Sequence, residues 1–320
     1  MSVLSQPQFH CEEAAFSWLE ATLWPQGPVC AHCGGMGRIG KIKANPEKRI
    51  RIGLHKCGDC KKQFTVKVGT VFEHARLPLH KMLQAVHLIC SSKKGISSHQ
   101  LHRILEVQYK TAWFLSHRIR EATRDGSLAP MGGIDGMPGA GGVVEADETF
   151  IGHEPGVPEA RAYHHKMKVL SLLDRDAGKV RSVVVDDIKP ETLRPIIEAN
   201  ILKEASYITD EASIYMKVGA TFAGHQMTTH SAKEYVRGIV HTNTVEGYFS
   251  VFKRGMKGVY QHCGKQHLHR YLAEFDFRYN NRVKLGCGAA ERTSRAVSGI
   301  VGKRLTYRSA HETRALRYAL

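Results

Sequence analysis

The alternation of apolar and polar positions divides the chain at a stretch where that alternation is lost. Residues 130–142, PMGGIDGMPGAGG, contain six glycines and two prolines and show almost no apolar periodicity, which predicts a flexible, Gly-rich linker. Before this stretch the pattern predicts mainly helices, and after it mainly strands followed by helices. The sequence therefore predicts two parts of different architecture.

The N-terminal part contains three predicted pieces. Residues 9–24 carry apolar side chains at helical spacing, and residues 61–72, KKQFTVKVGTVF, alternate as a β-hairpin does. Residues 78–124 predict three helices, and the last two, SSHQLHRILE and YKTAWFLSHRIREAT, are joined by the short VQ region. We expect the core side of the last helix to contain Trp113, Phe114 and Ile119.

The C-terminal part has an informative order of elements. A strand is expected around residues 143–150, two strands over 168–188 around a DAGK turn, a helix over 190–201 and a strand over 206–213. The segments TNTVEGYFSVFKRGMK and KQHLHRYLAEFDFRYNNR are helical in pattern. Three strands, a helix, a strand and then helices is the order of a ribonuclease H-like α/β fold, a mixed sheet flanked by helices.

Charge points to a polyanionic partner. The chain of 320 residues has 46 Lys and Arg against 30 Asp and Glu, a formal net charge of +16, and nucleic acid is the commonest polyanion. No apolar run is long enough to span a membrane, and the N-terminus lacks the pattern of a signal peptide. We therefore expect a cytoplasmic protein, in which paired cysteines favour metal binding over disulfides.

Four of the eight cysteines occur as two pairs. Cys30-x2-Cys33 and Cys57-x2-Cys60 are separated by 23 residues, and two such knuckles can close a tetrahedral, structural Zn²⁺ site with four thiolates. The alternative is two unrelated reduced pairs. The segment between the knuckles carries five basic residues, which suit phosphate contacts or belong to a solvated loop: Lys41, Lys43, Lys48, Arg49 and Arg51.

The last two helices of the N-terminal part resemble a helix-turn-helix reader of DNA. The second of them carries Lys110, Arg118 and Arg120, which we expect to contact DNA. The alternative is an ordinary helical bundle.

Carboxylates are expected to converge in the C-terminal part. Asp147 ends the first predicted strand and Asp210 the fourth, and these strands are neighbours in the ribonuclease H-like order. A third acid, Glu246, lies on a helix with 35 residues between it and Asp210, and Asn243 lies three residues earlier on the same face. Such oxygen ligands can hold two Mg²⁺ or Mn²⁺ ions.

Each of these acids also has a plainer interpretation, as a helix cap or a surface charge. Glu145 and Glu148 are more typical of flanking charges than of ligands. Lys253 lies seven residues after Glu246, two turns along the same helical face, where it can contact a phosphate next to the reacting one, and Arg254 follows it.

Together these motifs resemble a known family. The paired CxxC knuckles, VEADETFIG, YITDEAS, HTNTVEGYFSVFKRGMKGVYQHC and HLHRYLAEFDFRYNNR are similar to those of insertion-sequence transposases of the ISXO type, DDE enzymes with an N-terminal zinc ribbon. The likeness runs from about residue 10 to 307, and the helical motifs from 241 to 282 are highly specific.

The resemblance implies metal-dependent cleavage at transposon ends and transfer of the 3′ hydroxyl into target DNA. By position, Asp147 and Asp210 are the first two catalytic acids. Relatives use Asn or Glu as the third, and we favour Glu246 over Asn243 because Lys253 follows as in the wider DDE pattern. Thr242 stands where many DDE enzymes have Arg.

The expected organisation combines the pattern with the resemblance. The expected domains are an N-terminal helix (1–24), a zinc ribbon (25–76), a helical DNA-binding module (77–129), the linker (130–142), a ribonuclease H-like DDE catalytic domain (143–285) and a basic C-terminal tail (286–320) with one helix near 289–300.

The expected partners are double-stranded transposon ends and target DNA, bound by at least a dimer in the nucleoid. Two other functions stay open: a DNA-binding regulator with an inactive catalytic domain, and a structure-specific nuclease without strand transfer.

Overall fold

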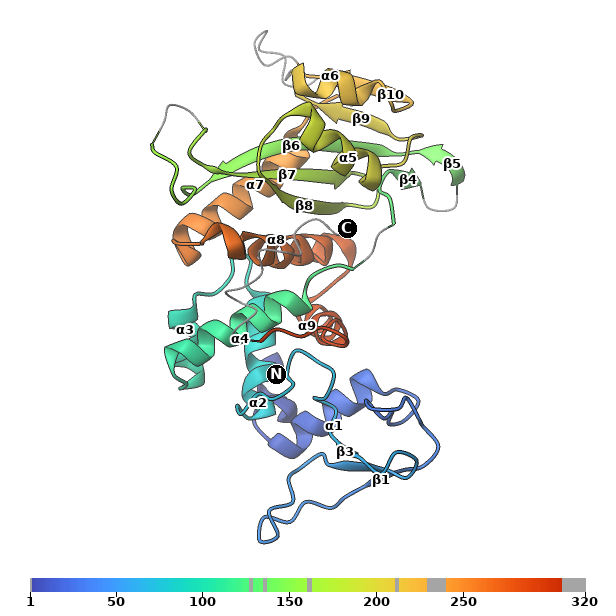
Figure 1. Cartoon of the computed structure of the whole chain (residues 1–320), viewed down its shortest axis with the longest axis vertical. Coiled ribbons are helices and arrows are strands. Elements are labelled where there is room, and N and C mark those ends of the chain that lie inside the picture. Colours follow the sequence, from blue (N-terminus) through green and yellow to red (C-terminus); the bar gives the residue numbers. More distant parts are fainter. Residues whose placement is uncertain are drawn as a thin grey trace. The chain divides into compact units, whose positions relative to one another are not determined.

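The structure is a computed structural model that describes residues 2–126, 129–134, 137–159, 163–210, 213–228 and 240–306 (Figure 1). The chain divides into two compact units. The ribbon–helix unit consists of residues 2–124 together with 287–306, and the sheet unit of the described residues between 125 and 286.

The ribbon–helix unit combines a small antiparallel sheet, in the order β1-β2-β3, with helices. Its elements are the 3₁₀ helices η1 (Val3–Ser5) and η2 (Pro7–Phe9), α1 (Glu12–Leu23), β1 (Ile39–Lys41), β2 (His55–Cys57), β3 (Gln63–Phe64), α2 (Leu79–Ser91), α3 (Ser98–Leu105), α4 (Tyr109–Ala122) and α9 (Ala289–Ser298).

The predicted hairpin over residues 61–72 is wrong. Only Gln63–Phe64 forms a strand, β3, which pairs with β2, and the chain then turns at Thr65, whose carbonyl accepts from the Val68 amide at 3.0 Å. Val66 and Val71 are buried although they lie outside any strand. The alternation therefore reflects the packing of an irregular segment rather than pleated strands.

The three predicted helices of residues 78–124 are present as α2, α3 and α4. The buried stripe of α4 is Ala112, Leu115 and Ile119, at the spacing of successive helical turns. Trp113 and Phe114 are only partly buried, so the expected core side was correct for Ile119 and wrong for the two aromatic residues.

The helix expected near residues 289–300 is present as α9 and belongs to the ribbon–helix unit. The Arg292 guanidinium donates to the Cys90 carbonyl at 2.9 Å, and the Thr293 hydroxyl lies 2.9 Å from Nδ1 of His87. The end of the described chain thus completes the packing of α2, more than 200 residues earlier in the sequence.

The sheet unit contains a five-stranded mixed sheet within its described residues. Its elements are β4 (Gly133–Ile134), β5 (Met137–Gly141), β6 (Val143–Ile151), β7 (Met167–Asp174), β8 (Lys179–Val185), α5 (Pro190–Asn200), β9 (Ser206–Thr209), α6 (Ser213–Gly219), β10 (Gly224–Met227), α7 (Asn243–Gly255), the π-helix η4 (Met256–Tyr260), α8 (Lys265–Asn280) and the 3₁₀ helix η5 (Val283–Leu285).

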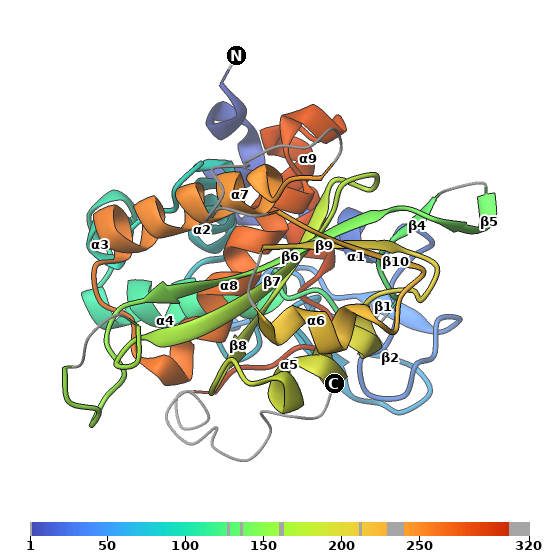
Figure 2. The same ribbon diagram turned by 90° about the horizontal axis from the view of Figure 1, so that it is seen from above.

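The strand order is β10-β9-β6-β7-β8. Antiparallel pairing joins β6 to β7 and β7 to β8, whereas β6, β9 and β10 run parallel. Helices lie on both sides of this sheet (Figures 1 and 2). Val144 and Ala146 of β6 pack in one apolar cluster with residues of α5 and α6, and Ile151 packs in another with residues of α7 and α8.

The predicted flexible linker is also structured in part. Within residues 130–142, β4 and β5 form a two-stranded antiparallel sheet. Glycine is required there by close packing: a Cβ on Gly141 would lie 1.6 Å from the Glu204 carbonyl oxygen, and one on Gly132 would lie 2.6 Å from the Ala205 Cβ. Gly132 and Gly141 therefore serve tight contacts.

Candidate functional site

The first acid of the site lies inside a strand rather than at its end. Asp147 is the fifth of nine residues in β6, which corrects the expectation that it ends the strand. The parallel neighbour β9 pairs with β6 only as far as Glu145, opposite Ile208, and ends at Thr209. Because β9 stops there, β6 has an open edge beside Asp147, and Asp210 follows β9 at the same edge.

This edge borders a pocket with a volume of about 400 Å³. Four acids and one lysine contribute to its walls. Asp147, Asp210, Glu246 and Lys253 were candidate site residues, whereas Glu148 was interpreted as a flanking charge. The lining residues are Asp147, Glu148, Asp210, Thr242, Glu246, Phe249, Ser250 and Lys253. Two strands and helix α7 thus bring together residues that are separated by more than 100 positions in the sequence.

The pocket disfavours the charged form of two of its carboxyl groups, those of Asp147 and Glu148. Burial and, after it, the charges of Glu148, Asp210 and Glu246 together raise the pKa of Asp147 to about 8, although a hydrogen bond from the Glu148 amide at 2.7 Å opposes the shift. Burial also raises the pKa of Glu148, although a hydrogen bond from the Tyr215 hydroxyl lowers it. A bound cation would relieve this repulsion.

The donors fit a hard divalent cation, because they are carboxylate oxygens gathered at one pocket. Among the described residues, only the four-cysteine cluster brings three or more His, Cys, Asp or Glu ligand atoms within 4.8 Å of one another. The acids of the pocket therefore line a common space without closing around one point.

The two candidates for the third residue differ in position. Glu246 lies on the exposed face of α7, lines the pocket and accepts from the Thr242 hydroxyl at 3.0 Å. Asn243 is also exposed, but it is not among the lining residues of this pocket. Of the two candidates, Glu246 is the one that lines the pocket together with Asp147 and Asp210.

Glu145, two residues before Asp147, has a structural role that the sequence pattern did not indicate. Its carboxylate is fully buried, pairs with Arg175 and accepts from the Val245 amide at 2.8 Å. It also lies 3.6 Å from His241. These contacts tie β6 to the β7–β8 turn and to the start of α7, which carries Glu246. The role of Glu145 could not be predicted from the sequence, because its partner Arg175 lies in a turn and has no distinctive pattern around it.

The four paired cysteines form a separate site in the ribbon–helix unit. The Sγ atoms of Cys30 and Cys60 are 3.6 Å apart, and those of Cys33 and Cys57 are 3.7 Å apart. Zn–S bonds of about 2.3 Å at tetrahedral angles would set thiolate sulfurs about 3.8 Å apart, so the arrangement fits zinc.

Backbone amides support a thiolate at this cluster. Burial raises the pKa of Cys30, but hydrogen bonds from the amides of His32 and Cys33 and from the thiols of Cys33 and Cys60 together outweigh it and lower the pKa to about 6. A thiolate is the form that binds zinc.

The residues expected to contact DNA lie in different environments. Lys110 and Arg254 are exposed. Arg118 is partly buried: it donates to the Glu73 carbonyl at 3.1 Å and covers the Phe114 ring at 4.7 Å. Arg120 has no exposed surface and donates to Ser116 at 2.8 Å, so we leave it out of any DNA interface.

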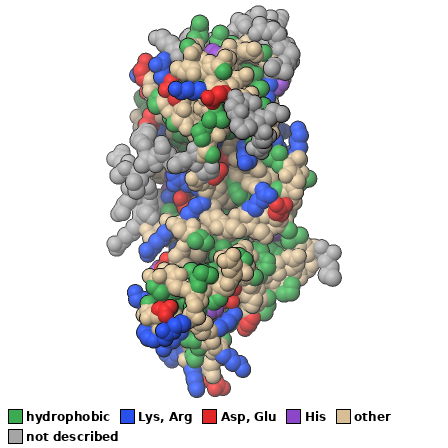
Figure 3. Space-filling model, turned by 90° about the vertical axis from the view of Figure 1, so that its right-hand side faces the viewer, with side chains coloured by type: hydrophobic (Ala, Val, Ile, Leu, Met, Phe, Trp, Pro, Cys, Tyr) green, Lys and Arg blue, Asp and Glu red, His purple; other side chains and the backbone are tan. Residues whose placement is uncertain are grey.

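The ribbon presents an exposed basic surface. Lys and Arg side chains gather around it at the lower end of Figure 3. The five basic residues between the cysteine knuckles are all exposed: Lys41, Lys43, Lys48, Arg49 and Arg51.

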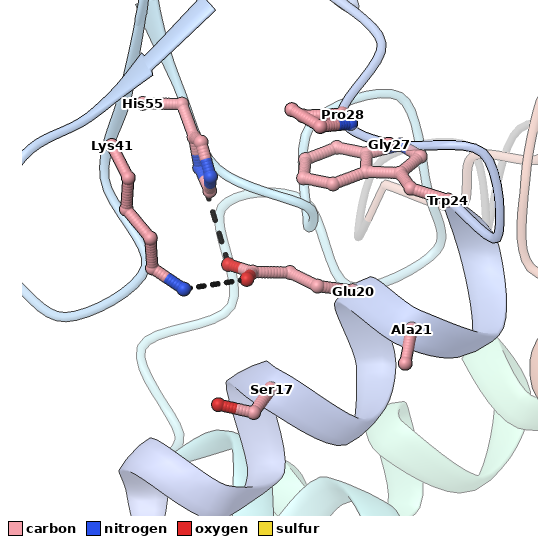
Figure 4. Close-up of a pocket in the computed structure, with 8 residues that line it drawn as sticks. All are labelled: Ser17, Glu20, Ala21, Trp24, Gly27, Pro28, Lys41 and His55. Atoms are coloured by element: carbon pink, nitrogen blue, oxygen red, sulfur yellow. Dashed lines mark hydrogen bonds and ion pairs between the residues drawn. The ribbon is translucent and has the colours of Figure 1, made fainter.

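A second pocket, of about 290 Å³, lies between α1 and the ribbon strands (Figure 4). At its centre the Glu20 carboxylate pairs with Lys41 at 2.7 Å and lies 3.9 Å from Nδ1 of His55. The Trp24 ring meets the His55 ring edge to face at 5.4 Å. These contacts join α1 to β1 and β2.

Comparisons with known proteins match both units. Residues 139–280 match the model of the ISXO2-like transposase domain, and residues 10–63 match that of the transposase zinc-ribbon domain. Over 292 residues the chain is 26% identical to a protein in the transposable element ISH50 of Halobacterium salinarum. The aligned region covers 84% of this chain and 91% of that protein. In the part of the chain that the structure describes, no helix has the length and apolar character needed to cross a membrane.

Proposed function

We propose that the chain is an insertion-sequence transposase, which cleaves DNA at insertion-sequence ends and transfers the strand into target DNA, because its residues match the ISXO2-like transposase domain and the transposase zinc-ribbon domain. The observation that carries the proposal is the single pocket shared by Asp147, Asp210, Glu246 and Lys253. The strand order supports it as well, since three antiparallel strands followed by two parallel ones at the other side of β6 is the arrangement of a ribonuclease H-like domain.

In this proposal Asp147, Asp210 and Glu246 hold two Mg²⁺ or Mn²⁺ ions. Bound there, such ions neutralise the phosphodiester and stabilise the charge that develops on the attacking and leaving oxygens. Asp147 lies on a strand that pairs with β7 along its length, so its backbone has a fixed position. Lys253 lines the same pocket and is suited to hold the phosphate next to the reacting one.

The reaction consists of two displacements at phosphorus. In the first, water attacks and the bond to the 3′ oxygen breaks, which leaves a 3′ hydroxyl and a 5′ phosphate. In the second, that 3′ hydroxyl attacks a phosphodiester of the target and displaces another 3′ oxygen. The same carboxylates and Lys253 serve both steps, because both place a phosphodiester in the same pocket.

The ribbon–helix unit supplies DNA binding in this proposal. A structural Zn²⁺ held by Cys30, Cys33, Cys57 and Cys60 would fix the ribbon, whose exposed basic residues suit phosphates. Lys110 on α4 and Arg254 on α7 are exposed and would contribute further contacts. Because both ends of an element must be joined, we propose that the chain acts on DNA as at least a dimer.

One assay separates this function from the two others considered above. The purified full-length protein is incubated with a labelled end duplex, a target plasmid and Mg²⁺ or Mn²⁺. Joined products support a transposase, nicking without joining supports a nuclease, and a gel shift without cleavage supports a regulator.

The matched variant is Asp147→Asn, which keeps the size of the side chain and removes its charge. We expect cleavage to fall at least about 100-fold, since a metal ligand is lost, while the gel shift persists. Unchanged cleavage would remove Asp147 from the site. Glu191→Gln, an exposed acid on α5, is the control and should behave as the unmodified chain.

A further inference from the structure

Glu148 occupies an unusual place in the pocket. It follows Asp147 in β6 and therefore points to the opposite side of the sheet, toward α6, where the Tyr215 hydroxyl donates to its carboxylate. It nevertheless lines the same pocket as Asp147 and Asp210. Both sides of β6 reach the pocket because β9 ends before this point, which leaves the strand edge open.

A buried carboxylate in a folded protein normally faces a cation or several amide donors. Glu145 in the same strand follows this rule, with an arginine and a backbone amide as partners. Glu148 is partly buried and its surroundings differ: the donors to its carboxylate are the neutral Tyr215 hydroxyl and a backbone amide, and the charge of Asp210 acts on it. Such surroundings suit a carboxylate whose cation arrives with the substrate or the metal.

Tyr215 holds Glu148 in this orientation. Its ring is fully buried in the apolar cluster between the sheet, α5 and α6, so the hydroxyl has little freedom to move. The hydrogen bond therefore sets the direction of the Glu148 carboxylate toward the pocket.

We propose that Glu148 is a fourth carboxylate of the cation site, acting beside Asp147 and Asp210, and that Tyr215 is its positioning residue. This inference rests on the proposed function, since it assigns a further ligand to the cations of the same pocket. Asp147 and Glu148 would approach the cations from the two sides of one strand edge.

The test measures cation binding directly, without DNA and without turnover. Zinc-loaded full-length protein is titrated with Mn²⁺, and the loss of the free-ion signal in electron paramagnetic resonance gives the dissociation constant. Glu148→Gln keeps the shape of the side chain and should raise that constant about tenfold, as should Asp147→Asn. Tyr215→Phe should raise it several-fold, and the exposed Glu191→Gln should leave it unchanged.

The outcomes separate the two levels of the argument. If Asp147→Asn weakens Mn²⁺ binding and Glu148→Gln does not, the role of Glu148 is overturned while the cation site stands. If neither variant weakens binding, the cation site of the proposed function fails. Circular dichroism of each variant shows that it is folded, and Glu148→Asp, which retains the charge on a shorter chain, should bind Mn²⁺ more tightly than Glu148→Gln.

Discussion

At the scale of single residues, the acids of β6 fall into two kinds. Glu145 is fully buried and balanced by Arg175, whereas Asp147 and Glu148 face a pocket in which acids outnumber bases. The first kind holds the scaffold, and the second is proposed to hold cations. Their behaviour on substitution should therefore differ.

Arg175→Met should be strongly destabilising. The change keeps much of the side-chain volume but leaves the Glu145 carboxylate buried without its cationic partner, which costs about 3–5 kcal/mol of the free energy of unfolding. Urea denaturation of the sheet unit within the full-length chain measures this loss. Asp186→Asn is the control: Asp186 pairs with Lys265 at 2.8 Å but is 57% exposed, so less than about 1 kcal/mol should be lost. Equal losses would contradict the buried role of Glu145.

Asp276 gives the sheet unit a pH dependence. Burial raises its pKa from 3.8 to about 6, although hydrogen bonds from Tyr248 and Ser182 oppose the shift. The folded chain therefore holds this proton more tightly than the unfolded chain, and the stability so gained is lost as the pH rises from about 4 to about 6.

Asp276→Asn should remove that dependence. Relative to the unmodified chain, the free energy of unfolding of the variant should rise by up to about 3 kcal/mol between pH 4 and pH 7. Urea denaturation at several pH values checks this, since all other groups titrate equally in both proteins. A difference that stays constant with pH would show that Asp276 is ionised in the folded chain throughout.

The sequence was a better guide to which acids lie near one another than to which side chains are exposed to solvent. Asp147, Asp210 and Glu246 line one pocket, although Asp147 lies within its strand and not at the strand end that the pattern predicted. Arg120 could not be predicted as buried, because an arginine on a helix is usually exposed and only the packing around α4 shows its hydrogen bond to Ser116.

At the scale of elements, apolar patterns were informative where an element has a buried face along its whole length. Every residue of β7 is buried, and its apolar pairs Val169–Leu170 and Leu172–Leu173 helped to predict the strand correctly. The edge strand β10 has four partly buried or exposed residues and gave no such pairs. In β4 and β5, glycines required by close packing hid the strands.

The α3–α4 turn offers a prediction at this scale. Glu106 follows α3 in the left-handed region at φ 52°, a conformation that glycine adopts without steric cost. Glu106→Gly should therefore stabilise the turn by about 0.5–1 kcal/mol. Slower hydrogen exchange of the amides of α3 and α4 would show this gain. Glu106→Ala keeps a Cβ and should bring no gain, and an equal effect of both variants would point to the lost charge instead.

At the scale of the whole chain, sequence order and spatial units differ. The described segment 287–306 belongs to the ribbon–helix unit, although the sheet unit separates this segment from residues 2–124 in the sequence. Local patterns predicted the helix α9 but carry no information on its partner, because the contacts of Arg292 and Thr293 with α2 span about 200 residues.

A chain that ends at Gly286 should therefore lose stability in the unit that lies at the opposite end of the sequence. Without α9, the Cys90 carbonyl and the His87 ring lose the partners that Arg292 and Thr293 provide, and the buried face of α2 becomes exposed to solvent. Amide hydrogen exchange, read by mass spectrometry, should become faster over Leu79–Ser91 while the central strand β7 stays protected. A chain that ends at Thr306 is the matched control, since it keeps α9 and should exchange as the full-length protein does. Unchanged protection of α2 in the shorter chain, or an equal loss in α2 and β7, would contradict the assignment of α9 to the ribbon–helix unit.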